Sequence, residues 1–315
     1  MNEFDLINTY FRVDTRSTEL GVGDDAAIIR PTPGMETYVA VDTLINGVHF
    51  PKRSPAASVG YRALAVNLSD LAAMGATPRW ATIALSLPEL DHHWVADFIE
   101  GFRRLADEYG IDLIGGDTTK GPLSVTVQAL GEAPRDTRLL RSAGQPGDDI
   151  YLTGSVGDAA AGLRLLKSQG GAENDHQQYL VDRFLWPTPR LGACGNLRAF
   201  ANAVIDVSDG LLADVSHIAN ASNLKAIVEK NLLPRSEALT QEFSDDEAFE
   251  FALCGGDDYE LIFTAPATAR AHLKSTDCSR IGVLESGSGI ELLAAGKPTA
   301  LPEQLGYEHG ADSPS

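Results

Sequence analysis

Apolar positions in the first 145 residues follow two periods, and each period predicts one kind of element. The segment His92–Tyr109 places apolar side chains three and four positions apart, which is the spacing of one helix face. A more continuously apolar segment begins after Ser54 and Pro55 and ends at Gly75, so we expect a helix with Ser54 as its N-cap. A short amphipathic helix is predicted at 3–12. Runs rich in Val, Ile and Leu predict strands at 38–42, 81–87, 111–114 and 124–130.

The second half of the chain alternates in the same way but in a different order. Apolar runs and periodic segments predict strands at 149–153, 203–207, 224–229, 261–264 and 280–284, and helices at 158–168, 210–222 and 267–275. The polar stretch 170–178 is predicted to be a flexible loop, and the tail from about residue 309 to be disordered. A stretch rich in Arg, Gly and Pro at 134–147 separates the halves. We therefore expect a mixed α/β fold of two domains, 1–145 and 146–315.

Composition narrows the class of protein. With 315 residues, 43% of them hydrophobic, the chain can bury a sizeable core, and its formal net charge of -19 argues against a nucleic-acid or membrane-surface binder. The cysteines, Cys194, Cys254 and Cys278, lack the CxxC spacing of a zinc site and indicate a reducing compartment. The sequence contains no signal-peptide pattern and no apolar run of about 20 residues, so a cytoplasmic protein is expected.

The apolar helix before Gly75 carries two polar residues, Asn67 and Asp70, which share a face because they stand three positions apart. Burying an amide and a carboxylate costs free energy unless each finds a partner. Similar carboxylates recur beside Gly, Ser or Thr where predicted elements end, at Asp24, Asp25, Asp42, Asp117, Asp206 and Asp209. Any one of them alone is more typical of a turn than of a functional site, and only the set as a whole points to a site.

Carboxylates that converge repel one another, and two unit charges about 4 Å apart cost about 4 kcal/mol at an effective dielectric constant of about 20. A converging set therefore requires cations, and carboxylate, water and phosphate oxygens are the ligands that Mg²⁺ prefers. Zinc is disfavoured because these carboxylates lack His and Cys partners. A magnesium cluster indicates phosphoryl transfer, although the nucleotide motifs GxxxxGK[ST] and GxGxxG are missing. Phosphate binding would then fall to the metals, to Gly115-Gly116 and to Arg141, which is equally consistent with a solvated loop charge.

A series of motifs extends over nearly the whole chain. They are Gly23-Asp24-Asp25-Ala26-Ala27, Val41-Asp42-Thr43-Leu44 with Gly47-Val48-His49-Phe50, Asn67-Leu68-Ser69-Asp70-Leu71-Ala72-Ala73-Met74-Gly75-Ala76, Gly115-Gly116-Asp117-Thr118, Arg141-Ser142-Ala143-Gly144, Val207-Ser208-Asp209-Gly210-Leu211 and Gly255-Gly256-Asp257-Asp258-Tyr259-Glu260-Leu261. In this order they resemble the thiamine-monophosphate kinases. Single motifs are shared across the wider superfamily of aminoimidazole-ribonucleotide synthetase, selenophosphate synthetase and a hydrogenase-maturation protein.

The resemblance implies a two-domain aminoimidazole-ribonucleotide synthetase-like fold and a homodimer whose N-terminal sheets form a shared barrel-like core. It also implies that ATP and several Mg²⁺ ions bind in a cleft between the domains. The implied reaction is direct in-line transfer of the γ-phosphoryl group of ATP to thiamine monophosphate, which gives ADP and thiamine diphosphate.

Position by position, the resemblance implies magnesium ligands at Asp25, Asp42, Asp70, Asp117, Asp206 and Asp209, with Asp24 as a neighbour. All of these except Asp206 and Asp24 would act in catalysis through the metals. The implied ATP contacts are Gly116, Asp117, Arg141 and Ser208, and the implied thiamine monophosphate contacts are His49, Asp257 and Tyr307. The family usually has Glu where this chain has Asp257. Ala40 and Val41 stand where relatives can have hydroxyl side chains, so a metal contact there would need backbone carbonyls.

Three alternatives remain. Selenophosphate synthetase would need a reactive cysteine or selenocysteine in the N-terminal segment, and no cysteine precedes Cys194. The hydrogenase-maturation protein would need a C-terminal cysteine, and the sequence ends in Ser313-Pro314-Ser315. A non-catalytic acidic sensor of metal or nucleotide would bind the same ligands without turnover.

Overall fold

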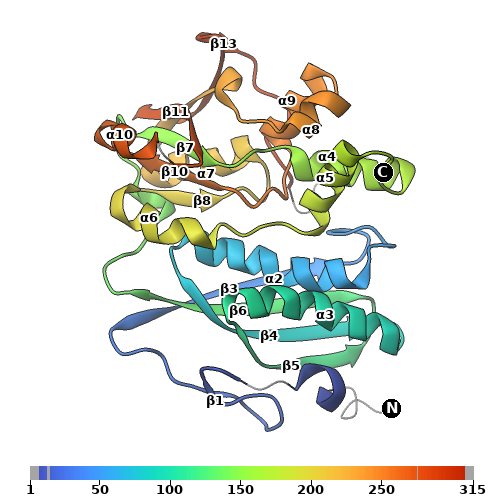
Figure 1. The fold of residues 1–315 in the computed structure, drawn as a ribbon. Coiled ribbons are helices and arrows are strands. Elements are labelled where there is room, and N and C mark those ends of the chain that lie inside the picture. The colour runs from blue at the N-terminus through green and yellow to red at the C-terminus, as the bar shows by residue number, and fades with distance from the viewer. Residues whose placement is uncertain (1–6, 13–14, 275, 309–315) are drawn as a thin grey trace. The chain divides into compact units, whose positions relative to one another are not determined.

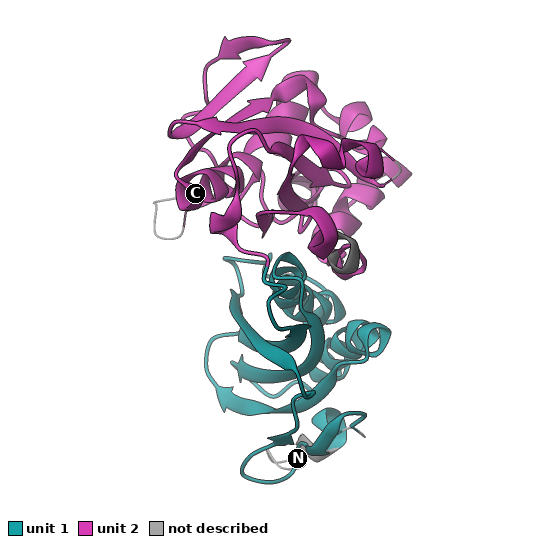
Figure 2. Cartoon of the chain, turned by 90° about the vertical axis from the view of Figure 1, so that its left-hand side faces the viewer, with its two compact units in different colours: residues 1–138 teal, residues 139–315 magenta. Residues whose placement is uncertain are grey.

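The computed structural model describes residues 7–12, 15–274 and 276–308. The chain divides into two compact units, residues 1–138 and 139–315 (Figure 2). Of the helix predicted at 3–12, the described part is a single π-helical turn, η1 (Ile7–Phe11), and the tail predicted to be disordered lies outside the described residues. No helix among the described residues is long and apolar enough to cross a membrane.

Unit 1 is built on a four-stranded sheet in the order β3-β6-β4-β5. Its strands are β3 (Met35–Ile45), β4 (Thr77–Leu87), β5 (Asp112–Lys120) and β6 (Ser124–Pro134). The β4–β5 pair is parallel, and the β3–β6 and β6–β4 pairs are antiparallel. Helices α2 (Ala56–Ala73) and α3 (His92–Tyr109) cover one face of this sheet (Figure 1). Strands β1 (Thr18–Leu20) and β2 (Ile28–Ile29) form a separate small sheet.

The sequence correctly predicted the bounds of α3, whereas the strands of unit 1 are longer than predicted. Asp42 was expected at the end of a strand, but β3 continues to Ile45. Asp117 was expected after a strand, but β5 runs through it to Lys120. The reason is that pairing with neighbouring strands extends each element beyond its apolar run. Both carboxylates therefore project from regular sheet positions, which determine the face that each one occupies.

Helix α2 packs against α3 through backbone contact at two glycines. A Cβ added to Gly60 would lie 1.9 Å from the carbonyl oxygen of Phe98, and one added to Gly101 would lie 1.8 Å from that of Ala57. The predicted N-cap of α2, Ser54, was wrong by one residue, and Pro55 is the N-cap. The Pro55 carbonyl accepts the first helical hydrogen bond, from Val59 N at 3.1 Å. The close crossing fixes the α2 backbone, and with it the position of Asp70.

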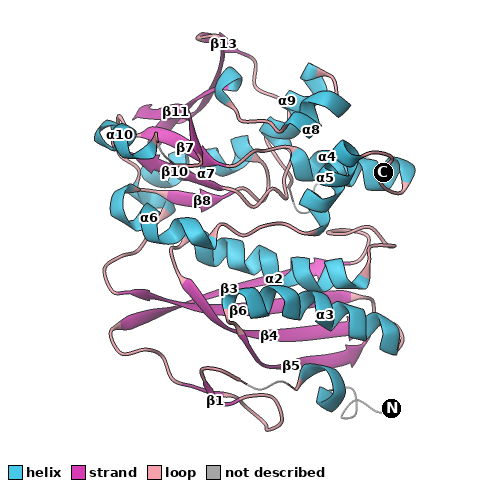
Figure 3. Cartoon of the chain, in the orientation of Figure 1, coloured by secondary structure: helices cyan, strands magenta, loops and turns pink. Residues whose placement is uncertain are grey.

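Unit 2 contains a seven-stranded sheet in the order β13-β12-β9-β11-β7-β10-β8. Figure 3 shows strands in magenta and helices in cyan. Its strands are β7 (Asp149–Thr153), β8 (Val204–Asp206), β9 (Leu224–Glu229), β10 (Leu261–Ala265), β11 (Cys278–Ser286), β12 (Gly289–Ala294) and β13 (Lys297–Thr299). The helices are α4 (Asp158–Gln169), α5 (Asp175–Leu185), α6 (Cys194–Phe200), α7 (Leu211–Ser222), α8 (Glu237–Glu242), α9 (Asp245–Cys254) and α10 (Arg270–Leu273).

The prediction of a loop at 170–178 was wrong for the second half of this stretch, because helix α5 begins at Asp175. Asn174 caps this helix, its side chain accepting a hydrogen bond from Gln177 N at 2.9 Å. The first turn is polar and the apolar face starts only at Leu180, so the periodicity is displaced from the start of the helix. Helices α8 and α9 and strands β12 and β13 were not predicted.

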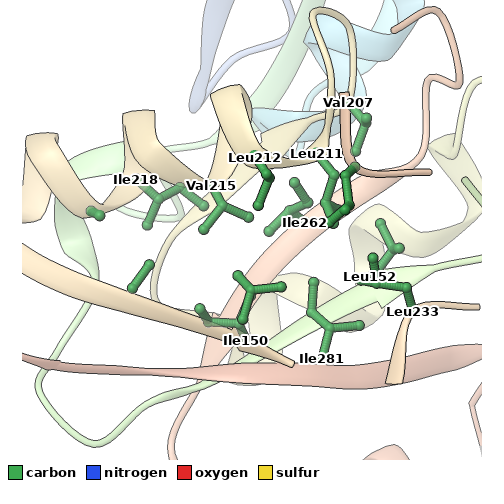
Figure 4. Close-up of a cluster of buried hydrophobic side chains, with 14 of the residues drawn as sticks. Ile150, Leu152, Val207, Leu211, Leu212, Val215, Ile218, Leu233, Ile262 and Ile281 are labelled. Atoms are coloured by element: carbon green, nitrogen blue, oxygen red, sulfur yellow. The ribbon is translucent and has the colours of Figure 1, made fainter. Parts of the chain in front are cut away.

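The main core of unit 2 lies between α7 and the sheet (Figure 4). Leu211, Leu212, Val215 and Ile218 of α7 pack towards buried side chains of β7, β10 and β11, among them Ile150, Leu152, Ile262 and Ile281. Val207, four residues before the first residue of α7, belongs to the same cluster. The segment that enters α7 is therefore anchored at both ends by apolar packing.

Candidate active site

Asp42 and Asp70 form a carboxylate pair in unit 1. Asp42 projects from β3 and Asp70 from the last turn of α2, and their side chains are hydrogen bonded to one another. Burial raises the pKa of Asp42 above its ordinary value of 3.8, and the hydrogen bond from Asp70 opposes this only in part. Two carboxylic groups that share a hydrogen bond must hold a proton between them, and a cation can take the place of that proton. The pair therefore fits the donor set of a hard divalent ion.

Asn67, one turn before Asp70 in α2, is fully buried. Its Nδ2 donates to the carbonyl oxygen of Ala63 at 3.1 Å, and its Oδ1 has no hydrogen-bond partner among the described residues. Because the amide bonds to its own helix, it acts as a local backbone partner.

His49 lies in the loop after β3, and its ring orientation is set by the end of that strand. The Ile45 amide donates to His49 Nδ1 at 3.0 Å, and the His49 amide donates to the Ile45 carbonyl at 2.9 Å. Because Nδ1 is an acceptor, the neutral ring carries its proton on Nε2. The predicted substrate contact is thus a pre-oriented Nε2–H donor.

Gly116 and Asp117 lie on β5, at the opposite edge of the sheet from Asp42. Gly116 has φ of +155°, and a Cβ there would lie 1.8 Å from the Ile83 carbonyl oxygen, so only glycine fits. Asp117 is exposed, as are Asp24 and Asp25 in the loop between β1 and β2. The structure of one chain therefore does not bring Asp117 to the Asp42–Asp70 pair.

In unit 2 the structure brings two motifs side by side. The segment 207–210 runs along 255–260, and the amides of Asp257 and Tyr259 donate to the carbonyls of Ser208 and Val207, each at 2.9 Å. A Cβ on Gly256 would lie 2.3 Å from the Ser208 carbonyl oxygen, so this approach requires glycine. The Tyr307 amide donates to the Asp209 carbonyl at 2.8 Å. Ser208, Asp209, Asp257 and Tyr307, predicted as separate contacts, therefore converge in one place.

Asp214, in the first turn of α7, holds the 208–210 segment in shape, and the sequence analysis missed it. Its Oδ2 accepts hydrogen bonds from the backbone amides of Ser208, Asp209 and Gly210, at 3.0, 3.2 and 3.2 Å. Burial, with the negative charges of Asp206 and Asp209, raises the pKa of Asp214 to about 8. An acidic residue in the first turn of a helix was the available signal.

Two of these carboxylates and His217, which was not predicted as a site residue, form a group with the ligand atoms of a metal site. Asp209, Asp214 and His217 each offer a ligand atom, and these atoms lie within 4.8 Å of one another. Asp206, at the end of β8, is buried beside them. Unit 2 therefore has its own set of carboxylates that fits a divalent cation.

Not every carboxylate of the Gly255–Leu261 motif is available to a ligand. The Asp258 carboxylate is buried and accepts hydrogen bonds from the amides of Gly157 and Ala159, so it caps the start of α4. Burial raises the pKa of Asp258 to about 8, although the charge of Arg183 lowers it. Asp257, by contrast, has φ of +70° and accepts a hydrogen bond from the Tyr259 hydroxyl at 3.0 Å.

Arg141 lies at the other end of α7 from Ser208. Its carbonyl oxygen accepts a hydrogen bond from the hydroxyl of Ser222, the last residue of α7, at 3.0 Å. A helix of this length is about 18 Å long, so its two ends are well separated. Unit 2 alone does not bring the exposed Arg141 side chain close to Ser208.

Comparisons with known proteins agree with this arrangement of motifs. Residues 23–133 match the AIR synthase related protein N-terminal domain, and residues 145–294 match the corresponding C-terminal domain. The chain is 42% identical over 320 residues to the thiamine-monophosphate kinase of Escherichia coli K12, with 98% of each protein covered.

Solved structures are similarly close. The crystal structure of thiamine-monophosphate kinase from Stenotrophomonas maltophilia K279a superposes with a TM-score of 0.86 at 45% identity, covering 95% of this chain and 98% of that one. AaThiL complexed with AMPPCP and TMP superposes with a TM-score of 0.81 at 32% identity, covering 97% and 95%. The predicted two-domain α/β fold is confirmed. The chain belongs to the AIR synthase related family and, within it, to the thiamine-monophosphate kinases.

Proposed function

We propose that this protein is an ATP-dependent kinase that converts thiamine monophosphate to thiamine diphosphate. The full-length identity to thiamine-monophosphate kinases and the similarity to AaThiL complexed with AMPPCP and TMP support this proposal. The observation that carries it is the backbone hydrogen bonding that joins Ser208 to Asp257 and Asp209 to Tyr307, because it supports a single site for the predicted nucleotide, metal and substrate contacts.

Several Mg²⁺ ions are part of the proposal. Asp25, Asp42, Asp70, Asp117, Asp206 and Asp209 would hold them, and the hydrogen-bonded Asp42–Asp70 pair supports this because it needs a cation or a proton. When bound, Mg²⁺ would neutralise the negative charge of the phosphate groups. This explains how a chain with a formal net charge of -19 can bind two anionic phosphate compounds.

The chain's own residues position the substrates. The His49 Nε2–H donates to the thiamine monophosphate phosphate, and Asp257 and Tyr307 hold the thiamine end. The shorter arm of Asp257 is held by the Tyr259 hydroxyl at 3.0 Å. Gly116 contacts ATP through its backbone, and Ser208 through its backbone and its hydroxyl group. Arg141 provides a cationic contact to ATP. The acceptor is an ionised phosphate oxygen, so the reaction requires no strong general base.

A coupled assay tests the function. Purified protein with ATP, Mg²⁺ and thiamine monophosphate is expected to produce ADP and thiamine diphosphate in equal amounts. Aminoimidazole precursors and selenide serve as control substrates and are expected to give no turnover. Binding of both substrates without ADP formation, across a range of Mg²⁺ concentrations, would support the sensor hypothesis instead.

We also propose a homodimer formed through the sheet of unit 1, with 1–145 as the dimerising domain and 146–315 as the second domain. The face of the sheet opposite α2 and α3 exposes a row of apolar side chains on β3 that includes Val39 (57% exposed), Val41 (59%) and Ile45 (41%). Exposed apolar strands of this length are normally covered by a partner. A cytoplasmic location stays a prediction from the sequence, based on the cysteine content and on the lack of a signal-peptide pattern or long apolar run.

The dimer is tested by Val39→Glu, which places a charge on the open face. This variant is expected to sediment as a folded monomer. The matched control is Leu90→Glu, since Leu90 is 41% exposed but lies outside the sheet. If wild-type protein and Val39→Glu sediment alike, the open face is not the dimer interface.

A further inference from the structure

We infer that Tyr259 is a positioning residue for Asp257, and that its hydroxyl group sets the direction from which the Asp257 carboxylate accepts a hydrogen bond from the substrate. The inference rests on the proposed function, which assigns Asp257 to the thiamine end of thiamine monophosphate. It adds the chemical class of the group that is recognised there, an N–H donor on an aromatic heterocycle such as the amino group of an aminopyrimidine.

The backbone from Asp257 to Tyr259 adopts a conformation that a large side chain disfavours. Asp257 has φ of +70° and Tyr259 has φ of +52°, both in the left-handed region. Asp tolerates this region, whereas bulky residues rarely occupy it, and Tyr259 is the one aromatic residue with positive φ among the described residues. Glycine would satisfy the backbone without strain. We therefore attribute the tyrosine at this position to what its side chain does.

The residues on either side of Tyr259 hold this strained backbone in place. The Asp258 carboxylate accepts hydrogen bonds from two backbone amides at the start of α4, at 2.6 and 3.1 Å. The Glu260 carboxylate accepts one from the Thr153 hydroxyl at 2.6 Å and is paired with two guanidinium groups. The Tyr259 amide itself donates to the Val207 carbonyl at 2.9 Å. Because the backbone is fixed on both sides, the direction of the Tyr259 side chain is fixed as well.

The hydroxyl group of Tyr259 is directed at Asp257. The residue is buried, with 7% of its surface exposed, and its hydroxyl donates to Asp257 Oδ1 at 3.0 Å. Burial of the ring alone would be achieved equally well by phenylalanine, so packing does not account for the hydroxyl. A hydrogen bond to a carboxylate is stronger than one between neutral groups, and it restricts the rotation of that carboxylate. The hydroxyl therefore holds Asp257 in one orientation.

Asp257 keeps the capacity to bind a ligand. It is half-buried, and a carboxylate can accept about four hydrogen bonds in all. Since a carboxylate accepts and does not donate, the ligand group that meets it must carry a donor. The amides of Asp257 and Tyr307 donate to the consecutive carbonyls of Ser208 and Asp209, at 2.9 and 2.8 Å. This places the Asp257 backbone beside Tyr307, the other proposed contact to the thiamine end.

A double-mutant cycle tests whether Tyr259 acts through Asp257. Tyr259→Phe keeps the ring and removes only the hydroxyl. It is expected to raise KM for thiamine monophosphate about tenfold, equivalent to about 1.4 kcal/mol, and to leave kcat and KM for ATP unchanged. In an Asp257→Ala background the same change is expected to have no further effect, because no carboxylate remains to be positioned. An equal factor in both backgrounds, or no change of KM in Tyr259→Phe alone, would overturn the inference.

The matched control is Tyr151→Phe. Tyr151 is a second buried tyrosine of unit 2, 4% exposed, and its ring stacks on Phe263 with the ring centroids 5.2 Å apart. Its substitution removes a hydroxyl from a buried ring without touching Asp257, and KM is expected to stay at the wild-type value. A similar rise of KM in this control would show that loss of a buried hydroxyl is sufficient, and the inference would be wrong.

A substrate analogue gives a readout that a purely structural role would not change. Oxythiamine monophosphate has an oxygen substituent in place of the amino group, so it offers Asp257 an acceptor where thiamine monophosphate offers a donor. The wild type is expected to prefer thiamine monophosphate in kcat/KM by roughly tenfold or more, and Tyr259→Phe is expected to lose most of this preference. An undiminished preference in Tyr259→Phe contradicts the inference.

Binding measurements separate this inference from the proposed function. The wild type, Tyr259→Phe, Asp257→Ala and the double variant are titrated with thiamine monophosphate by calorimetry, and Kd is expected to follow the same cycle as KM. If the wild type binds with this pattern of Kd but forms no ADP, the proposed function fails and the inference stands. If it forms ADP while Tyr259→Phe keeps the wild-type Kd, the inference alone fails. Absence of both binding and turnover rejects both.

Discussion

Buried or half-buried carboxylates are treated differently in the two units. In unit 2, Glu260 is fully buried and accepts hydrogen bonds from the Thr153 hydroxyl and from the guanidinium groups of Arg183 and Arg190. In unit 1, the Asp42 carboxyl is hydrogen bonded to Asp70, and no basic side chain among the described residues acts on its pKa. A carboxylate that is paired with basic side chains of the same chain, such as Glu260, stabilises the fold. Two carboxylates that are hydrogen bonded to each other, such as Asp42 and Asp70, instead fit a cation site.

The largest expected effect comes from Asp70→Asn. Loss of one charge from the proposed magnesium cluster is expected to lower kcat by roughly 10³-fold or more, because neutralisation of the transferring phosphoryl group is the main catalytic term. The melting temperature is expected to change little, because the asparagine amide can donate to Asp42 the hydrogen bond that the Asp70 carboxyl group makes. A near-normal rate would remove Asp70 from the site and erase the contrast between the units.

Glu260→Gln is expected to have the opposite signature. Loss of this carboxylate leaves Arg183 and Arg190 without their counter-ion, and breaking a buried ion pair costs about 3–5 kcal/mol. Urea denaturation measures the loss. The matched control is Glu291→Gln, which removes a half-exposed pair with Lys225 and is expected to cost less than about 1 kcal/mol. Equal costs would contradict the assignment of Glu260 to the scaffold.

Asp214 accepts hydrogen bonds from backbone amides of its own chain and also lies beside the carboxylates of Asp206 and Asp209. Its substitution is expected to have the smallest effect of the three. Asp214→Ala leaves three backbone amides without an acceptor, at a cost of about 1–3 kcal/mol, and loosens the segment that bears Ser208 and Asp209. Asp214→Asn keeps an acceptor oxygen. We therefore expect kcat to fall in Asp214→Ala and to be largely rescued in Asp214→Asn, with KM for ATP following the same order. A failure of rescue would indicate that Asp214 needs its charge.

The sequence predicted the elements whose periodicity is local. The bounds of α3 follow from its apolar spacing, and those of β7 and β9 from short apolar runs between turns. It missed α5, α8 and α9, because short helices with polar first turns show little periodicity. Likewise, the role of Asp258 could not be predicted, since its partners are the distant backbone amides of Gly157 and Ala159, which only folding brings near. Asp214 was missed although its place in the first turn of α7 was a local signal.

By itself, the sequence determined the family and the carboxylate motifs and predicted a requirement for cations, because these depend on residue type and spacing. Residue type alone does not separate Asp257 from Asp258; the resemblance pointed to Asp257, and only the tertiary structure showed that one lies against Tyr259 and the other caps the start of α4. It also listed Asp42 and Asp117 as equal members of one cluster. The strand order placed them on opposite edges and faces of a sheet, because strand pairing joins segments that are distant in the chain.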